Sequence, residues 1–442
     1  MRLIYHWLKS DYPTALALPT YRIIIVLTVL LIGGNTAAQL HAQSDWPTFR
    51  GADRSGTATD TGLLKQWPKN GPKLLWTASG SGQGYAGVAV AGGKLYTLGD
   101  GISGDKDEFL TCFNQADGVF QWKFKTGSPW TKGKPSWQHS RSTPTVDGDR
   151  VYVLTPHGVL WCVGTDGKKK WQVNLKDAFA GKKAESWGYS ESVLIDGDNL
   201  ICTPGGPKNT MVALNKMTGK KVWSTAREKD RGAGHASIVI SNIGGTKVYV
   251  TTTGSGAMGV RASDGKLMWT FDVPKTTAVI PTPIVRDDLV FVSFGYGTGG
   301  ALLRQLPNGS EVGMTEVYPL NGRLTNKHGG VVLVGDQVYG DTDARGKPFC
   351  ADLLTGNVRW VAGRSKGGGK KSAAITAADG NLYVLYENAV MSLVKADPES
   401  YQEISSFKVP GDTELPTWAH PVIVDGKLYL RVGENILCYA LK

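Results

Sequence analysis

The motif Gly-x-x-x-Trp recurs along most of this chain of 442 residues and constrains its fold more than any other feature. Eight short segments of alternating apolar and polar residues accompany it, at intervals of 42 to 56 residues. Strand-like alternation with a period of this length indicates the four-stranded blades of a β-propeller. The 57 glycines favour many turns and argue against a helical bundle or a disordered chain. The five copies, each preceded by Asp or Thr, are Gly118/Trp122, Gly167/Trp171, Gly219/Trp223, Gly265/Trp269 and Gly356/Trp360.

The two ends of the repeat region complete one another. The last repeat stops at Leu441 after its third strand, and the segment 73–76, which ends in Trp76, has the form of the missing fourth strand. We therefore predict an all-β fold over residues 73–442, an eight-bladed β-propeller of four-stranded antiparallel blades. Its ring is closed by an N-terminal strand in the last blade. Blades five and seven lack the tryptophan, and Tyr318 and Phe407 are expected to replace it.

The Asp/Thr-Gly-x-x-x-Trp turn, with a small residue in the preceding strand, resembles the tryptophan-docking repeat of the pyrroloquinoline-quinone-repeat (quinoprotein-like) family. The resemblance covers about residues 73–442. The family includes quinoprotein alcohol dehydrogenases and non-catalytic relatives such as an outer-membrane-assembly propeller lipoprotein, so it implies a fold and leaves the function open. It also implies that six repeat tryptophans are structural: Trp76, Trp122, Trp171, Trp223, Trp269 and Trp360.

Residues 1–42 are expected to be a signal peptide rather than part of the fold. An apolar run of ten residues, 23–32, follows a basic, polar stretch, and small residues allow cleavage after Ala38 or Ala42. Ten residues are too few to cross a bilayer as a helix, although an uncleaved anchor remains the alternative. No cysteine near the cleavage region could accept a lipid. We expect a periplasmic or secreted protein with a leader segment, 43–72, and no transmembrane span in the mature chain.

The cysteines do not indicate disulfides or zinc, although export would permit disulfides. Cys112, Cys162, Cys350 and Cys438 occupy one equivalent position in different repeats, where Ala213 and Val260 stand in two others. Equivalent positions in separate sheets lie too far apart for a disulfide. We expect small buried core residues and no metal site of Cys and His.

The loops that lead from the fourth strand of one blade to the first strand of the next are expected to open on a central funnel. Three of them share the pattern Trp-x-His/Tyr, and four of the five histidines after residue 42 lie just before a first strand. Such a lining suits a planar ligand or a peptide, whereas the alternative is that these side chains only hold the loops in place. The ligand-binding candidates are Trp137, His139, Arg141, Trp187, Tyr189, Glu191, His235, His328, Lys371, Trp418 and His420.

A quinone-dependent dehydrogenase would need a carboxylate base and Ca²⁺ bound by oxygen ligands. Glu185 and Glu191 are the main acids near a first strand, and Glu191 is the weak catalytic candidate. Asp105, Asp107 and Glu108 read as a solvated surface turn rather than a metal site. Adjacent cysteines and the larger insertions of the dehydrogenases are absent, as is any nucleophile motif. Pyrroloquinoline quinone with Ca²⁺ is thus a conditional expectation, and whether the protein is an enzyme stays open.

Positive charge concentrates on the predicted funnel face. Lys and Arg number 49 against 38 Asp and Glu, and the excess of 11 becomes 9 without residues 1–42. After assignment to the predicted loops, one face carries about +8 of this excess. Two loops, 123–141 and 361–372, dominate and contain no acidic residue. We expect an anionic partner whose affinity falls as salt rises.

Three functions fit these observations. The first is a binding or scaffold module of the cell envelope that uses a basic, aromatic-lined funnel face. The second is a pyrroloquinoline-quinone-dependent alcohol or sugar dehydrogenase, and the third is a carbohydrate- or polyanion-binding propeller. The expected partner is an anionic ligand or an envelope protein. Nucleic acid is not an expected partner, because an exported protein is separated from it. The protein is expected to be a monomer.

Overall fold

The computed structural model describes residues 45–101, 104, 106–274, 277–343, 346–411 and 414–442. All described residues belong to one compact unit, residues 43–442. The predicted signal peptide, with Ala38 and Ala42, lies outside the described residues. Within the described part, no helix has the length and apolarity needed to cross a membrane.

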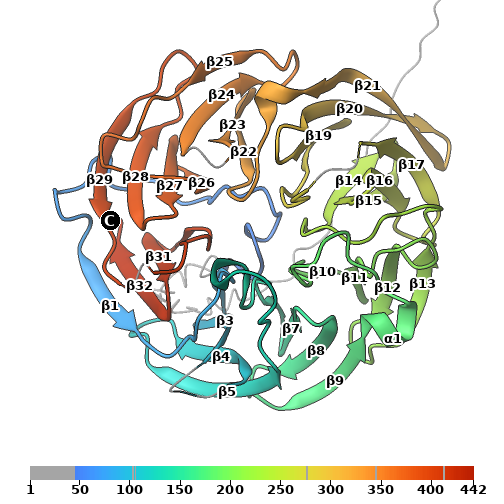
Figure 1. The fold of residues 1–442 in the computed structure, drawn as a ribbon, viewed down its shortest axis with the longest axis horizontal. Coiled ribbons are helices and arrows are strands. Elements are labelled where there is room, and N and C mark those ends of the chain that lie inside the picture. The colour runs from blue at the N-terminus through green and yellow to red at the C-terminus, as the bar shows by residue number, and fades with distance from the viewer. Residues whose placement is uncertain (1–44, 102–103, 105, 275–276, 344–345, 412–413) are drawn as a thin grey trace, which may run out of the picture. The chain divides into compact units, whose positions relative to one another are not determined.

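The described residues form eight four-stranded antiparallel sheets arranged as a ring (Figure 1), which confirms the predicted propeller. The first four blades are β2 (Ala89–Ala91), β3 (Lys94–Asp100), β4 (Glu108–Asn114) and β5 (Phe120–Gly127); β6 (Thr145–Asp147), β7 (Arg150–Leu154), β8 (Val159–Gly164) and β9 (Lys169–Asn174); β10 (Leu194–Asp196), β11 (Asn199–Cys202), β12 (Met211–Asn215) and β13 (Lys221–Thr225); and β14 (Val239–Ile243), β15 (Thr246–Thr253), β16 (Gly256–Arg261) and β17 (Leu267–Asp272).

The remaining blades are built in the same strand order. Only the last differs, because its fourth strand comes from the N-terminal end of the propeller. They are β18 (Ile284–Arg286), β19 (Leu289–Phe294), β20 (Gly299–Asn308) and β21 (Glu311–Asn321); β22 (Val331–Val334), β23 (Gln337–Thr342), β24 (Lys347–Asp352) and β25 (Val358–Val361); β26 (Ala373–Ala378), β27 (Asn381–Tyr386), β28 (Val390–Lys395) and β29 (Glu403–Lys408); and β30 (Val422–Val424), β31 (Lys427–Val432), β32 (Asn435–Ala440) and β1 (Leu74–Ala78). One short helix, α1 (Leu175–Phe179), follows blade two.

The ring closes in blade eight by pairing of the two ends of the propeller. β1 lies antiparallel to β32, and Trp76 faces Cys438 across the pair. Because β1 comes from the N-terminal end of the propeller and β30 to β32 from the C-terminal end, unfolding of this blade would open the ring. This arrangement confirms closure by an N-terminal strand.

The repeat glycines receive the aromatic ring of the preceding blade. A Cβ added to Gly118, whose φ is +72°, would lie 2.6 Å from the ring of Trp76. Trp122, Trp171 and Trp223 meet the next glycine in the same way, and Tyr318 does so at Gly356. Most of these rings also donate a hydrogen bond to a carbonyl of the next turn, as from Trp171 Nε1 to Lys216 O at 3.0 Å. Each blade is thus locked to the next.

Small residues such as cysteine occupy these strand positions because each position faces the indole ring of a repeat tryptophan. Cys112, Cys162, Cys350 and Cys438 each pair across two strands with a repeat tryptophan. All five cysteines are free and buried. In blade four the residue that faces Trp269 is Gly259 rather than Val260. The register shifts directly after it, as it does after the facing residues Cys112, Cys162 and Cys350.

The hydrophobic core is divided among the spaces between neighbouring blades rather than gathered in one centre. Separate clusters join blades one and two, two and three, and so on around the ring. The largest cluster joins blades seven, eight and one, and it includes Trp46, Leu63 and Trp67 of the leader. The leader is therefore part of the packed fold.

A second set of contacts joins the blades close to the ring axis. The backbone N–H of Gly87 donates to Thr143 Oγ1 at 2.9 Å, and Thr143 N donates to Ser192 Oγ at 3.1 Å. The series continues from Ser192 N to Ser237 Oγ at 3.1 Å and from Ser237 N to Thr282 Oγ1 at 3.2 Å. From blade two to blade five, one hydroxyl before each first strand thus satisfies a buried N–H of the preceding blade, and we refer to this series as the hydroxyl chain.

The leader crosses the centre of the ring, where Figure 1 shows its blue trace. Trp46 pairs with Val90 of blade one, while Arg50 Nη2 donates to Val331 O of blade six at 2.6 Å. Arg54 Nη1 donates to Ser192 O at 2.8 Å and Ile238 O at 3.1 Å, just before the first strands of blades three and four. Contacts with blades on opposite sides of the ring place these residues on its axis.

Candidate functional site

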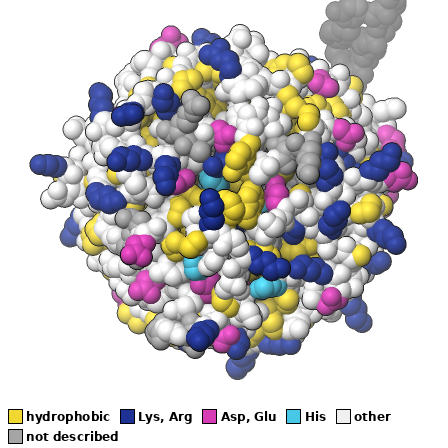
Figure 2. Space-filling view, in the orientation of Figure 1, with side chains coloured by type: hydrophobic (Ala, Val, Ile, Leu, Met, Phe, Trp, Pro, Cys, Tyr) yellow, Lys and Arg dark blue, Asp and Glu magenta, His cyan; other side chains and the backbone are white. Residues whose placement is uncertain are grey.

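A cavity of about 500 Å³ lies at the centre of the ring. All eight loops that lead into a first strand contribute to its wall, and Phe49 of the leader contributes from the axis of the ring. Figure 2 shows hydrophobic, cationic and histidine side chains gathered over this centre. The cavity is therefore built from loops far apart in sequence that the ring brings together.

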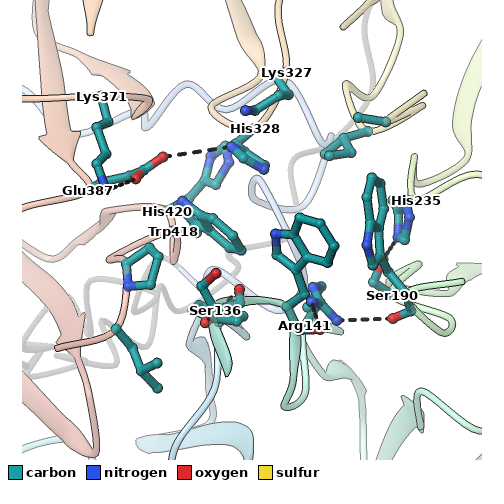
Figure 3. Close-up of a pocket in the computed structure, with 18 of the residues that line it drawn as sticks. Ser136, Arg141, Ser190, His235, Lys327, His328, Lys371, Glu387, Trp418 and His420 are labelled. Atoms are coloured by element: carbon teal, nitrogen blue, oxygen red, sulfur yellow. Dashed lines mark hydrogen bonds and ion pairs between the residues drawn. The ribbon is translucent and has the colours of Figure 1, made fainter. Parts of the chain in front are cut away.

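Eight of the eleven predicted ligand-binding residues line this cavity. Most of them are drawn in Figure 3, which shows side chains directed toward one another from opposite loops. The eight are Trp137, Arg141, Trp187, His235, His328, Lys371, Trp418 and His420.

The other three predicted residues, His139, Tyr189 and Glu191, are absent from the cavity wall among the described residues. His139 Nδ1 lies 2.8 Å from Asp100 Oδ1. Tyr189 is 1% exposed and its hydroxyl donates to Pro204 O at 2.9 Å.

Glu191 is also buried, and its carboxylate accepts hydrogen bonds from Thr203 N at 2.8 Å and Thr203 Oγ1 at 3.1 Å. Burial raises the pKa of Glu191 to about 7, although the hydrogen bonds from Thr203 and the charge of Arg54 oppose the rise. Tyr189 and Glu191 thus anchor the chain on both sides of Ser190. Ser190, which points the other way, lines the cavity.

Ser190 takes part in a chain of three polar groups. Its Oγ lies within hydrogen-bond distance of His235 Nδ1, and His235 Nε2 lies 3.0 Å from Glu185 Oε2. Burial lowers the pKa of His235 to about 4, further lowered by the charge of Lys183, so the imidazole is neutral at pH 7. Burial favours a raised pKa for Glu185, but its hydrogen bond and charge interaction with His235 bring the pKa below the ordinary value.

Backbone pairing brings Glu185 to His235. Ala233 N donates to Lys182 O at 2.8 Å, and Ala184 N donates to Ala233 O at 3.0 Å. These bonds align the loop before blade three with the loop before blade four, because Ala184 directly precedes Glu185 and Ala233 lies two residues before His235. Lys183 Nζ adds a bond to Gly234 O.

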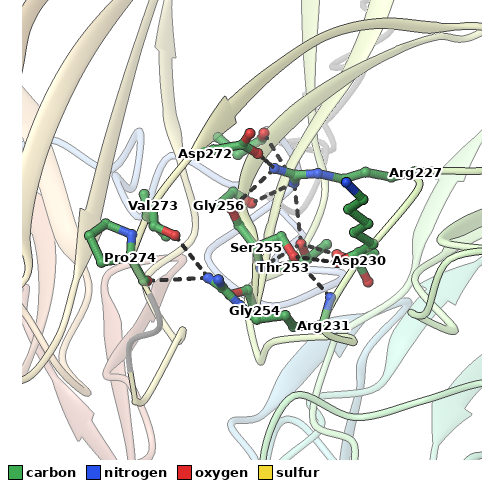
Figure 4. A network of polar contacts seen from close by, with 12 residues as sticks. Arg227, Asp230, Arg231, Thr253, Gly254, Ser255, Gly256, Asp272, Val273 and Pro274 are labelled. Carbon is green, nitrogen blue, oxygen red and sulfur yellow. Dashed lines mark hydrogen bonds and ion pairs between the residues drawn. The ribbon is translucent and has the colours of Figure 1, made fainter.

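A polar network holds the loop that carries His235 (Figure 4). Asp230 accepts hydrogen bonds from Gly206 N and Gly232 N, both at 2.9 Å. Arg227 is 3% exposed, and its Nη2 donates to Asp272 Oδ1 at 2.6 Å. Buried polar groups that are fully hydrogen-bonded hold a loop rigidly, so this network fixes the direction in which His235 enters the cavity.

Aromatic rings and cations form the opposite wall. Trp418 stacks on His328 with ring centroids 4.3 Å apart, and Lys371 Nζ lies 3.8 Å from Glu387 Oε2. Burial lowers the pKa of His328 well below its ordinary value and that of His420 to about 3. The histidines of the cavity are therefore uncharged at neutral pH, and its positive charge comes from Lys and Arg.

Arg141 is a cation on the cavity wall that joins two of the loops. Its guanidinium donates to Trp187 O at 3.1 Å and to Trp137 O at 2.5 Å, which ties two loops together. Burial lowers its pKa to about 10, so it stays charged at neutral pH. The charged lining comprises Arg141, Lys327, Lys370, Lys371, Glu387 and Glu414, an excess of cations.

The acidic stretch expected as a solvated turn is partly internal. Glu108 is fully buried in β4 and accepts hydrogen bonds from Thr126 Oγ1 at 2.8 Å and Ser140 Oγ at 2.5 Å. Burial raises its pKa to about 7. Asp107 pairs with Lys125 at 2.7 Å, and Asp105 lies outside the described residues. The expectation was wrong for Glu108 because alternation in β4 turns its side chain inward.

The described residues offer no cluster of carboxylates for the Ca²⁺ of a quinone site. Calcium takes six to eight oxygen ligands, yet among the described residues no three His, Cys, Asp or Glu side chains converge as metal ligands. The Glu191 and Glu185 carboxylates are instead bonded within the protein. The one deeply set carboxylate of the described cavity wall, Glu387, lies beside Lys371 and His328.

Several cavity residues escaped sequence reasoning, among them Phe49, Tyr85, Ser190, Tyr296 and Lys327. Tyr85 and Lys327 lie in the same kind of loop as the predicted residues, so the loop position could have indicated them. Ser190 lies between two residues that were chosen for their size and charge. Phe49 carries no signal in the repeat, because it reaches the cavity only through the path of the leader.

Residues 107–362 match the family model described as outer membrane protein assembly factor BamB. No curated protein matches the chain. Among solved structures, BamB from Moraxella catarrhalis is similar with a TM-score of 0.53 at 15% identity, covering 86% of this chain and 94% of that one. Quinohemoprotein alcohol dehydrogenase from Comamonas testosteroni gives 0.58 at 11% identity, with 90% and 80% covered.

A europium-containing methanol dehydrogenase gives a TM-score of 0.59 at 10% identity, with 88% of this chain and 90% of that chain covered. At such identities the similarity to these structures shows the propeller fold and no more.

Proposed function

Because this chain belongs to the family of the outer membrane protein assembly factor BamB, to whose model residues 107–362 match, we propose that it is a binding module of the cell envelope. It takes an anionic protein partner at the central cavity. Residues 1–42 direct its export, so that it acts in the periplasm or outside the cell. It acts as a monomer. The observation that carries the proposal is the excess of cations among the aromatic side chains of the cavity wall.

The aromatic lining supports binding of a chain-like partner. Trp137 and Trp187 meet edge to face with centroids 5.8 Å apart, and Tyr85 packs on Trp418 at 4.5 Å. Rigid aromatic walls bury apolar area at low cost in side-chain entropy. Lys327, Lys371 and Arg141 would meet acidic side chains of the partner and speed its encounter.

A second candidate is an anionic polysaccharide. The stacked pair of Trp418 and His328 supports it, because flat rings pack against the apolar face of a sugar. Lys or Arg would then bind carboxylate or sulfate groups. No observation on the described residues favours the quinone-dependent dehydrogenase in the same way, because no three of their His, Cys, Asp or Glu side chains form a metal-binding group.

The test compares a fluorescent polyglutamate peptide with a fluorescent anionic oligosaccharide by fluorescence anisotropy. The variant Lys327→Glu with Lys371→Glu reverses two charges at the cavity, and the control Lys168→Glu with Lys220→Glu reverses two exposed charges in turns between third and fourth strands, on the opposite face. The cavity variant should bind at least about tenfold more weakly, and the control should bind as the wild type does.

Binding should also weaken as salt rises from about 50 to about 200 mM. Tighter binding of the oligosaccharide than of the peptide would favour the second candidate. Equal binding by the cavity variant and the control, or binding that salt does not change, would contradict a role for the cationic cavity.

A further inference from the structure

We propose that Ser190, His235 and Glu185 form a nucleophile, base and acid chain that hydrolyses carboxylic esters in the central cavity. The inference goes beyond the binding function and does not depend on it. A serine and a base within hydrogen-bond distance, with the base oriented by a third group, are the geometric signature of nucleophilic catalysis. Here Ser190 and His235 line the cavity, and Glu185 lies behind them.

The hydrogen bonds determine which way the protons point. The ionised Glu185 carboxylate can only accept, so the bond at 3.0 Å requires a proton on His235 Nε2. In the neutral imidazole Nδ1 is then an acceptor, and Ser190 must donate its hydroxyl proton to it. The serine oxygen is therefore paired with a base that is free to take its proton.

Ser190, His235 and Glu185 can together perform acyl transfer without a cofactor. Ser190 Oγ attacks the ester carbonyl carbon while its proton passes to His235 Nδ1. The carbon–oxygen bond to the alcohol breaks, and the alcohol leaves with that proton. Water then attacks the acyl-serine, gives a proton to His235 Nδ1, and Ser190 regains it as the carboxylic acid departs. Glu185 stabilises the imidazolium in both steps and holds the ring in place.

The surroundings indicate the class of ester. Arg141, whose guanidinium donates to Trp187 O three residues before Ser190, supplies a positive charge on the same wall for the oxyanion (Figure 3). Lys327 and Lys371 line the same cavity. We therefore assign esters whose alcohol part is negatively charged as the preferred substrates.

The protein has a second pair of a serine and a histidine near the cavity, which can be compared with Ser190 and His235. Ser372 Oγ lies 3.2 Å from His328 Nδ1, but Glu387 Oε1 approaches the same nitrogen, at 4.0 Å. Among the described residues, no hydrogen bond or ion pair joins a carboxylate to the other ring nitrogen of His328, so none orients that ring as Glu185 orients His235. Ser372 is also 1% exposed, whereas Ser190 is half-buried and lines the cavity. Ser372→Ala is therefore the matched control for Ser190→Ala.

The test uses the purified full chain. A fluorophosphonate probe followed by peptide mass spectrometry should label Ser190, and p-nitrophenyl acetate should be hydrolysed, faster when the ring carries a carboxylate. Ser190→Ala should lose labelling and at least about a hundredfold in turnover, with the melting temperature unchanged. Ser372→Ala should retain both. Wild-type protein that is neither labelled at Ser190 nor active, or equal loss in both variants, would overturn the proposal.

Glu185 is a positioning residue, and its test separates that role from folding. Glu185→Gln should lower kcat about tenfold or more at unchanged KM, because the amide cannot stabilise the imidazolium. Glu185→Asp keeps the charge and should recover part of kcat. A Glu185→Gln protein as active as the wild type would overturn the assignment of the acid.

Discussion

Arg54 Nη1 donates a hydrogen bond to the carbonyl oxygen of Ser192 at 2.8 Å, although the two residues lie 138 positions apart. The same guanidinium also bonds to Ile238 O, so one leader side chain satisfies carbonyls that precede two first strands. Arg54 is 3% exposed, and burial lowers its pKa to about 10. The leader therefore acts as a central support of the ring on which the cavity is built.

Replacement of Arg54 by Met should destabilise the propeller by about 3 kcal/mol, because it leaves several buried carbonyls without a donor. Lys65→Met is the control, since Lys65 is exposed and its ion pair with Asp379 at 2.6 Å lies at the surface. That change should cost less than about 1 kcal/mol. Urea denaturation followed by tryptophan fluorescence measures both. Similar midpoints for the two variants would show that the leader does not support the ring.

Gly118→Ala should destabilise the protein more than Gly380→Ala. Both glycines have positive φ, +72° and +76°, so both substitutions strain the backbone equally. Only at Gly118 would the new Cβ meet a ring, that of Trp76, whereas nothing lies within 4 Å at Gly380. The difference should be about 1–3 kcal/mol, measured from the two unfolding midpoints. Equal losses would mean that the docked ring adjusts freely.

Ser237→Ala tests the hydroxyl chain. Ser237 Oγ accepts the buried N–H of Ser192 at 3.1 Å, and its loss leaves that donor unpaired. The free energy of unfolding should fall by about 1–3 kcal/mol. Ser237→Thr should keep the bond, because Thr143 and Thr282 accept equivalent bonds in neighbouring blades. A threonine variant as unstable as the alanine variant would instead implicate packing.

Acid should destabilise the protein partly through His420. Burial lowers its folded pKa to about 3, below the ordinary 6.5, so between these values the unfolded chain binds protons more readily. Stability from this group is present above pH 6.5 and is lost as the pH falls, by at most about 1.4 kcal/mol per unit. His420→Gln should flatten the fall in urea midpoint between pH 7 and pH 4. Glu108 and Glu191, whose folded pKa is raised to about 7, act in the opposite sense in both proteins. An unchanged pH dependence in the variant would contradict this assignment.

Local pattern was sufficient to predict the architecture. Each glycine of the repeat turn has to accept an aromatic ring from the blade before it, and Gly118 with Trp76 shows why the two residue types recur together. The same pattern predicted that the segment ending in Trp76 completes the last blade, and in the structure Trp76 lies opposite Cys438 there. Loop position also led to most of the cavity-lining residues, because every loop into a first strand ends beside the ring axis.

The finer structure of the cavity could not be predicted in this way. Tyr189 and Glu191 were predicted to bind a ligand because of their residue types. In the structure their side chains alternate with that of Ser190, so Ser190 faces the cavity and the two predicted residues face away from it. The partnership of Glu185 with His235 depends on backbone pairing between two loops at Ala233. Neither contact has a fixed spacing in the sequence.

The sequence by itself determined the eight-bladed ring, its closure and the excess of positive charge, because each follows from a period or a count that no other part of the chain can alter. Only the tertiary structure decided that the leader crosses the ring axis through Arg50 and Arg54. It also decided that Ser190, His235 and Glu185 meet. Such contacts join residues from different blades, and their distances are set by how the blades pack around the axis rather than by the order of residues along the chain.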